Sequence, residues 1–123
     1  MQIPVPVGDV LDKITILRIK SRKITSEAKL VNVRSELAAL TARWEAEGYP
    51  TLPEEAQLEA VNESLWEVED ELRRHEARQD FGPEFITRAR SVYQINDRRA
   101  RLKRAVNEAL GSELVEEKDY VAY

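Results

Sequence analysis

The side chains with the clearest chemical potential lie between positions 96 and 103. A stripe with alternating steps of three and four residues runs through this segment, and it consists of Phe85, Ala89, Val92, Asn96, Arg99, Lys103, Val106 and Leu110. The three polar members interrupt a stripe that is apolar before and after them. A buried cation is costly unless it is paired or hydrogen-bonded. We therefore interpret Asn96, Arg99 and Lys103 as a candidate site for an anionic ligand, with the two cations as donors and the amide as an orienting group.

The same stripe has a second interpretation that needs no ligand. The helix can rotate so that Ile95 and Leu102 face the core while Arg99 and Lys103 face solvent. Long helices drift by about 20° per heptad relative to a strict seven-residue repeat, so such a rotation is ordinary. The sequence leaves both interpretations open.

The basic run at residues 97–104 contains five cations in eight residues, which is a pattern that can bind phosphates. The run contains no aromatic residue for stacking on bases, and the whole chain has a formal net charge of −4. We therefore expect a solvated helix face whose cations pair with acids of a neighbouring element, and not a nucleic-acid site.

The sequence contains little that indicates a metal site or a catalytic nucleophile. The chain has no cysteine and a single histidine, His75, which excludes a thiolate or histidine-based metal site. Carboxylates one turn apart occur at Asp9 and Asp12, at residues 67 and 70, and at residues 113 and 116, but 23 acids produce such spacings by chance. We expect no catalytic residue, no metal and no cofactor.

The elements that must position these residues are helices. Pro4 and Pro6 keep residues 1–7 extended as an arm. Amphipathic periodicity and capping signals predict helices over residues 8–23, 26–47, 52–78 and 83–110. A capping box at Asp9 and Asp12 is expected to open the first helix, and one at Thr51 and Glu54 the third. Residues 111–123 form an apolar tail, which is expected to dock on the bundle.

Two of these segments have regular heptads. Apolar residues follow 3, 4 spacing at Leu30, Val33, Leu37, Leu40 and Trp44, and again at Leu58, Val61, Leu65, Val68 and Leu72. The link between the two segments is short, which predicts that they pack together as an antiparallel hairpin. The predicted fold is therefore a single all-α domain over residues 1–123, an antiparallel bundle of about four helices with an extended arm and a docked tail.

Three apolar side chains do not fit one buried stripe. Ile16 and Ile19 lie opposite the main apolar side of the first helix, and Trp66 lies off the heptad stripe of the third. A helix that is apolar on two sides is usually buried on two sides, and exposed tryptophan is enriched at interfaces. We therefore expect a homodimer with Ile16, Ile19 and Trp66 at its interface.

Composition indicates where such a domain works. No apolar run approaches the roughly 20 residues that span a bilayer, so we expect no membrane association. The absence of cysteine fits a reducing compartment. The first six residues lack the features of a signal peptide. Together these observations predict a cytoplasmic protein.

Two stretches resemble a known family as wholes. They are Ile3-Pro-Val-Pro-Val-Gly-Asp-Val-Leu-Asp-Lys-Ile-Thr-Ile-Leu, and Asp80-Phe-Gly-Pro-Glu-Phe-Ile with its continuation through Arg90-Ser-Val-Tyr to Gly111-Ser-Glu-Leu-Val-Glu-Glu-Lys. The chain is similar to an uncharacterised bacterial domain-of-unknown-function family of short helical proteins. Members tend to occur beside or fused to glycosyltransferase-type proteins. The resemblance implies a link to polysaccharide biosynthesis and a glycosyltransferase-type partner, but no reaction.

A shorter stretch, Leu11-Asp-Lys-Ile, resembles the first helix of helical chorismate mutases, whose pockets hold a dicarboxylate with Arg and Lys. The resemblance implies Arg18 or Arg22 as a further anion-binding residue. The sequence departs from that pattern at Thr15-Ile-Leu, where paired Ile-Asp steps are usual. The function we expect is a non-catalytic, homo-oligomeric accessory or interaction domain. The alternative is a small-molecule enzyme or binder that holds an anionic metabolite in a bundle pocket.

Overall fold

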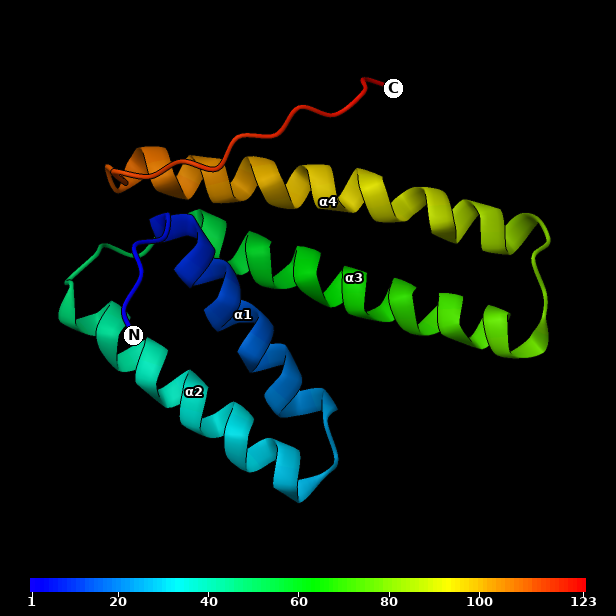
Figure 1. Ribbon diagram of the computed structural model, residues 1–123, viewed down its shortest axis with the longest axis horizontal. Helices are drawn as coiled ribbons and strands as arrows, with labels where there is room; N and C mark the ends of the chain where they lie inside the picture. The colour runs from blue at the N-terminus through cyan, green and yellow to red at the C-terminus, as the bar shows by residue number, and fades with distance from the viewer.

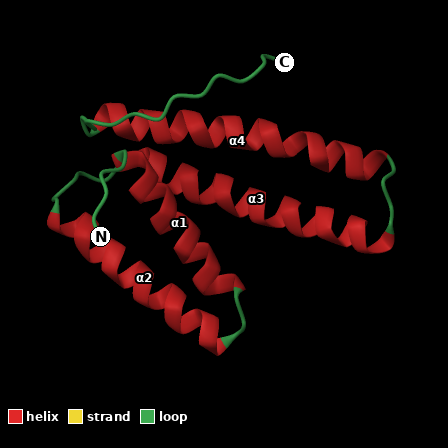
Figure 2. Cartoon of the chain, viewed as in Figure 1, coloured by secondary structure: helices red, strands yellow, loops and turns green.

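The computed structural model describes residues 1–123 and consists of four helices joined by short links, with no strand (Figure 2). The helices are α1 (Val7–Lys23), α2 (Glu27–Ala46), α3 (Pro53–Arg78) and α4 (Pro83–Ala109). The predicted all-α fold is confirmed. Each helix begins and ends within one residue of the bounds expected from sequence. Figure 1 shows two antiparallel hairpins, α1–α2 and α3–α4, which meet at one end and diverge at the other.

The glycine and proline signals predicted at the helix ends are observed, but the predicted capping boxes are not. Gly48 and Gly111 adopt positive φ just beyond α2 and α4, and prolines occupy the first turns of α3 and α4, as expected. The two predicted capping boxes are wrong. The N-cap positions belong to Pro6 and Leu52, and neither α1 nor α3 has a side-chain cap. The acids of α1 thus remain available for other partners.

The pairing of the heptad helices is also wrong. α2 packs along α1, and its backbone does not approach that of α3. α1 lies between the two (Figure 1). The reason is the two-sided character of α1, because one of its sides receives α2 and the other receives the α3–α4 hairpin. α1 therefore has buried residues around most of its circumference, including Leu11, Ile14, Leu17 and Ile19.

The core lies where α1 crosses the α3–α4 hairpin. Leu11, Leu58 and Val106 are almost fully buried and pack together, with Trp44 and Leu52 against them. Along α3 the apolar stripe is buried through Leu65 and then emerges, so that Val68 and Leu72 are only half-buried. We call residues 53–65 and 96–109 the inner half of the hairpin and residues 66–93 the outer half.

The tail runs back along α4, as expected for a docked segment (Figure 1). Near its start, the Ser112 hydroxyl accepts a 3.1 Å hydrogen bond from the backbone N–H of Val7. At its end, the Tyr123 hydroxyl donates a 2.6 Å hydrogen bond to Asp97, and its ring packs edge-on against Tyr93. The first five residues of the arm are exposed.

Candidate functional site

Arg99, the central cation of the α4 stripe, is engaged by a carboxylate of α1. Its Nε and Nη2 donate to the two oxygens of Asp12 at 2.9 and 2.6 Å, which is a bidentate pair. Asp12 is 4% exposed. The amide of Asn62 on α3 donates to both Asp12 and the hydroxyl of Thr15, at 2.9 and 3.0 Å. The hydrogen bond from Arg99 to Asp12 raises the arginine pKa, and burial opposes this only in part.

Lys103 is engaged one turn further along α4. Its Nζ lies 3.1 Å from Asp9 of α1 and 3.0 Å from Glu116 of the tail. Burial lowers the pKa of Lys103, but the hydrogen bonds to Glu116 and Asp9 outweigh that effect, so the pKa is raised. In return, the hydrogen bond from Lys103 holds the pKa of Glu116 below its ordinary value.

A backbone approach completes this junction. The N–H of Gly8 donates a 2.6 Å hydrogen bond to the buried side chain of Asn107. A Cβ at position 8 would collide with the carbonyl oxygen of Lys103. Gly8 is therefore needed for the first turn of α1 to lie this close to α4. Two of the three polar residues of the α4 stripe, Arg99 and Lys103, are thus explained by the docking of α1.

Neither interpretation drawn from the stripe describes this arrangement fully. The stripe keeps its register and does not rotate into solvent, since the side chains of Arg99 and Lys103 are only 29% and 15% exposed. Their charges are matched by acids of α1 and the tail, as expected for the basic run. Sequence reasoning missed Asp9 and Asp12 as partners because it assigned them to a cap. The only available signal was the fact that two acids one turn apart match two cations one turn apart.

The four anion-binding candidates do not converge on one cavity. Arg18 pairs with Glu55 and Glu59 of α3. Asn96 borders a hollow of about 560 Å³ beneath the tail, whereas Lys103 borders a separate hollow of about 160 Å³. Arg99 borders neither of them.

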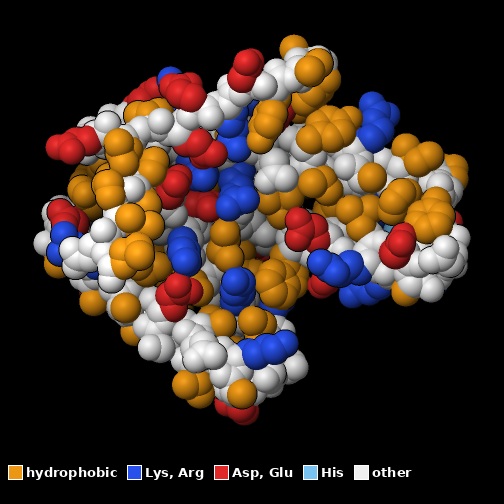
Figure 3. All heavy atoms as spheres, in the orientation of Figure 1, with side chains coloured by type: hydrophobic (Ala, Val, Ile, Leu, Met, Phe, Trp, Pro, Cys, Tyr) orange, Lys and Arg blue, Asp and Glu red, His pale blue; other side chains and the backbone are white.

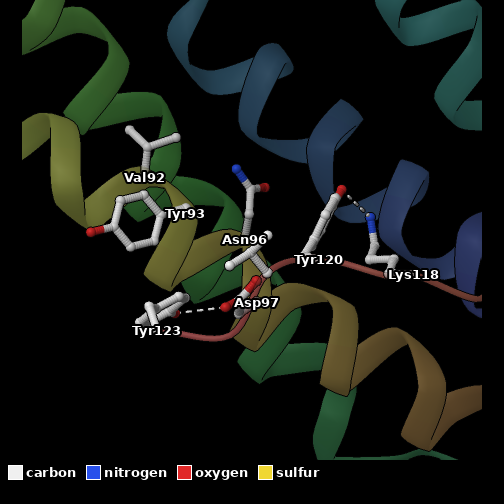
Figure 4. A pocket seen from close by; sticks show the side chains of 8 residues that line it. Val92, Tyr93, Asn96, Asp97, Lys118, Tyr120 and Tyr123 are labelled. Carbon is white, nitrogen blue, oxygen red and sulfur yellow. Dashed lines mark hydrogen bonds between the residues drawn. The ribbon is translucent and has the colours of Figure 1, made fainter.

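The hollow beneath the tail lies between one face of α4 and the last residues of the chain. Figure 4 shows Val92, Tyr93, Asn96 and Asp97 on α4, with Tyr120 and Tyr123 from the tail beside them. Lys118 lies on the tail with its Nζ 3.4 Å from the Tyr120 hydroxyl. The Asn96 side chain has no hydrogen-bond partner within the chain.

The three residues predicted at a dimer interface differ in their burial within the chain. Ile19 is 1% exposed within its own chain, so its assignment to an interface is wrong. By helical periodicity Ile19 lies on the side of α1 that carries Asp12 and Thr15, and this side faces the α3–α4 hairpin of the same chain. Ile16 and Trp66 are half-buried. Trp66 borders a hollow of about 480 Å³ between the end of α1 and the α3–α4 hairpin, together with Lys23 and Arg88.

A larger apolar surface covers the outer half of the hairpin. Figure 3 shows hydrophobic side chains gathered over the outer ends of α3 and α4. The exposed members are Phe81, Ile86 and Tyr93, and the half-buried members are Val68, Leu72, Phe85, Ala89 and Val92. Sequence reasoning missed this surface because it treated the outer part of the α4 stripe as core. We call it the outer surface.

The total exposed area is large for the size of the chain. A folded monomer of 14.2 kDa is expected to expose about 6,800 Å², whereas this chain exposes 8484 Å². The excess is about 1,700 Å², and a standard interface buries about 800 Å² per partner. Only nine hydrophobic side chains form the buried core, so much apolar surface lies outside it.

Comparison with known proteins gives one match. The model of a family of unknown function, DUF6165, matches residues 1–123. No curated protein and no solved structure matches the chain. None of the four helices is long and apolar enough to cross a bilayer.

Proposed function

The chain belongs to this family of unknown function, and we propose that it is a non-catalytic helical interaction domain that works as a homodimer. The observation that carries the proposal is the exposed area, which exceeds that of a monomer of this mass by about twice what one partner buries in a standard interface.

The polar junction supports the same proposal. Arg99 and Lys103 are matched by Asp12, Asp9 and Glu116. This network joins α1 to α4, so its residues have a structural role. A ligand at this place would have to displace an acid from a cation that already holds it. Binding of a partner at the outer surface requires no such displacement.

Light scattering over a range of protein concentrations tests the proposal. We expect a mass of twice 14.2 kDa at high concentration, with dissociation on dilution. A mass of one chain at every concentration would overturn it. Circular dichroism on the same samples would show that the helices persist in whichever species is present.

A second candidate function is the binding of a small anionic metabolite beneath the tail. The hollow there is within the size range of ligand pockets. It is bordered by the amide of Asn96, which has no partner in the chain, and by the ammonium of Lys118, which an anion would share with Glu116. Isothermal titration with a small dicarboxylate would test it, with Asn96→Ala as the variant expected to lose any binding. Failure of both proteins to bind would remove this candidate.

The cellular setting is also part of the proposal. The absence of cysteine suits a reducing compartment, and we place the protein in the bacterial cytoplasm. The family resemblance supports a glycosyltransferase-type protein as a further partner and polysaccharide biosynthesis as the process. Co-purification of the tagged, full-length chain from its native host would test that association. Recovery without any glycosyltransferase would count against it.

A further inference from the structure

From the outer half of the α3–α4 hairpin we infer that two copies of this chain pair through the first half of α4, antiparallel and about a twofold axis near Ala89. The inference rests on the proposed homodimer and names its interface. It begins with the width of the apolar stripe on α4. At 100° per residue, Phe85, Ile86, Ala89, Val92 and Tyr93 fill an arc of about 120°. A helix that packs on a single neighbour through a narrow seam needs less than this.

The inner half of α4 shows what normally occupies that arc. Seven and eleven residues beyond Val92 on the same stripe, Arg99 and Lys103 contact α1 through Asp12 and Asp9. Asn107, on the same side of α4, holds the backbone of Gly8. α1 then diverges with α2 (Figure 1). The outer half of α4 therefore presents an apolar continuation of the face that binds α1 in the inner half. Phe85 at its edge packs on His75 of α3, but α1 does not reach this part of the face.

A second copy fits this face better than an unrelated helix does. In a twofold pair the same patch appears on both sides, so an apolar stripe meets an apolar stripe. Ala89 lies at the centre of the stripe, where a small side chain allows two helix axes to come close. Antiparallel pairing then places residues before Ala89 beside residues after it, so that Phe85 of one copy lies near Tyr93 of the other.

The border of the stripe is polar, as at the rim of a protein interface. On α3, Asp70, Arg73 and Arg74 follow Trp66 along the side that faces α1 in the inner half. On the other border, Asp97 accepts a hydrogen bond from Tyr123, whose ring packs on Tyr93 of the stripe. Over the whole chain, the arm and tail included, the excess of about 1,700 Å² is about twice the roughly 800 Å² that a standard interface takes from each partner.

The experiment uses the absence of cysteine in the full-length chain. Ala89→Cys introduces one thiol at the expected axis, and Ala42→Cys introduces one at an exposed position of α2 as the matched control. A short bifunctional maleimide should link Ala89→Cys into a covalent dimer and leave Ala42→Cys largely unlinked. Equal linking of both variants, or of neither, would overturn the inference.

A pair of charge variants gives an independent measurement. Ile86→Arg and Val31→Arg both place a cation at an exposed, β-branched position, with the original side chains 53% and 64% exposed. Ile86→Arg should weaken the dimer by about tenfold or more, because it puts like charges into an apolar contact, while Val31→Arg should not. Both variants should retain the circular dichroism of the parent.

The outcomes separate the interface from the function. If the parent chain dimerises but Ile86→Arg dimerises equally well, the inferred interface is wrong and the proposed homodimer stands. If the parent is a monomer at every concentration, both fail.

Discussion

The two halves of the α3–α4 hairpin share the apolar stripe of α3 but have different surroundings, and the stripe of α4 is polar in the inner half and apolar in the outer half. In the inner half, α1 crosses the hairpin, and Leu58 and Val106 are almost fully buried. In the outer half, the same stripe continues through Leu72 and Phe85, which are only half-buried. An apolar stripe that continues along a helix therefore does not guarantee a core along its whole length. The apolar side chains of the pair are almost fully buried only where α1 covers it, whereas the outer half buries the single polar ring of His75 against Phe85.

The largest expected effect comes from truncating one leucine in each half. Leu58→Ala should lower the free energy of unfolding by about 4 kcal/mol, near the upper part of the range for buried leucine, because Leu58 is 0% exposed. Leu72→Ala should cost about 1–2 kcal/mol in dilute solution, since its side chain is already half in water. Chemical denaturation of both variants measures the difference, and equal losses would contradict the comparison.

The next effect concerns the pair that joins α1 to the inner half. Arg99→Met leaves the carboxylate of Asp12 buried with only Asn62 as a side-chain donor. We expect a loss of about 3 kcal/mol, at the low end for a broken buried pair because Arg99 is partly exposed.

Arg101→Met is the matched control for this loss. Arg101 is exposed on the same helix and makes no ion pair, so its replacement should change the free energy of unfolding by less than about 0.5 kcal/mol. Thermal or urea unfolding measures the free energy of unfolding of both variants. Equal losses in Arg99→Met and Arg101→Met would contradict the structural role of the Arg99–Asp12 pair.

A smaller effect should follow from the close approach of α1 to α4. Gly8→Ala places a methyl group against the carbonyl oxygen of Lys103, and we expect a loss of about 2 kcal/mol from overpacking. Gly82→Ala is the comparison in the outer half, where the added Cβ meets only the Asp80 carboxylate at 3.3 Å, and it should cost less than about 1 kcal/mol. Urea unfolding compares them, and an unchanged midpoint for Gly8→Ala would show that the two helices can separate freely.

The smallest effect is the dependence of tail docking on pH. Lys103 holds the pKa of Glu116 below its ordinary 4.5. The contribution of this contact is therefore complete above the ordinary pKa and is lost as the pH falls through the lowered value. NMR signals of the tail should shift between about pH 5 and 3, within that window.

Glu116→Gln provides the control for the tail. This variant cannot titrate at position 116, so its tail should be loosened at neutral pH and should lack that part of the acid transition. A tail transition that is unchanged in Glu116→Gln would assign the effect to another carboxylate.

Much of the local structure could be predicted from local signals. The glycines after α2 and α4 and the prolines that open α3 and α4 placed the helix ends to within one residue, because these residues act on their own backbone. The capping interpretation of Asp9 and Asp12 was wrong for the opposite reason. A cap and an ion pair use the same carboxylate, and the partner of Asp12 lies 87 residues away along the chain.

For the candidate site too, the sequence predicted which residues are unusual but not which residues they contact. The sequence correctly singled out Arg99 and Lys103 as polar members of an apolar stripe and expected the basic run to pair with acids. It could not tell which acids, and it placed Ile19 at an interface because the second side of α1 had no visible partner. In the folded chain, that side faces the α3–α4 hairpin, where Asp12 and Thr15 contact Asn62 of α3.

The sequence by itself determined the helices, their lengths and the stripes that they bury, since these depend on residues within a few turns of one another. Only the tertiary structure decided that α2 packs on α1, that the acids of α1 neutralise the cations of α4, and that the outer half of the α3–α4 hairpin is left uncovered. The physical reason is that apolar burial is non-directional. An apolar stripe requires a cover but does not specify which helix provides it, and that choice depends on the whole set of helices competing for the same faces.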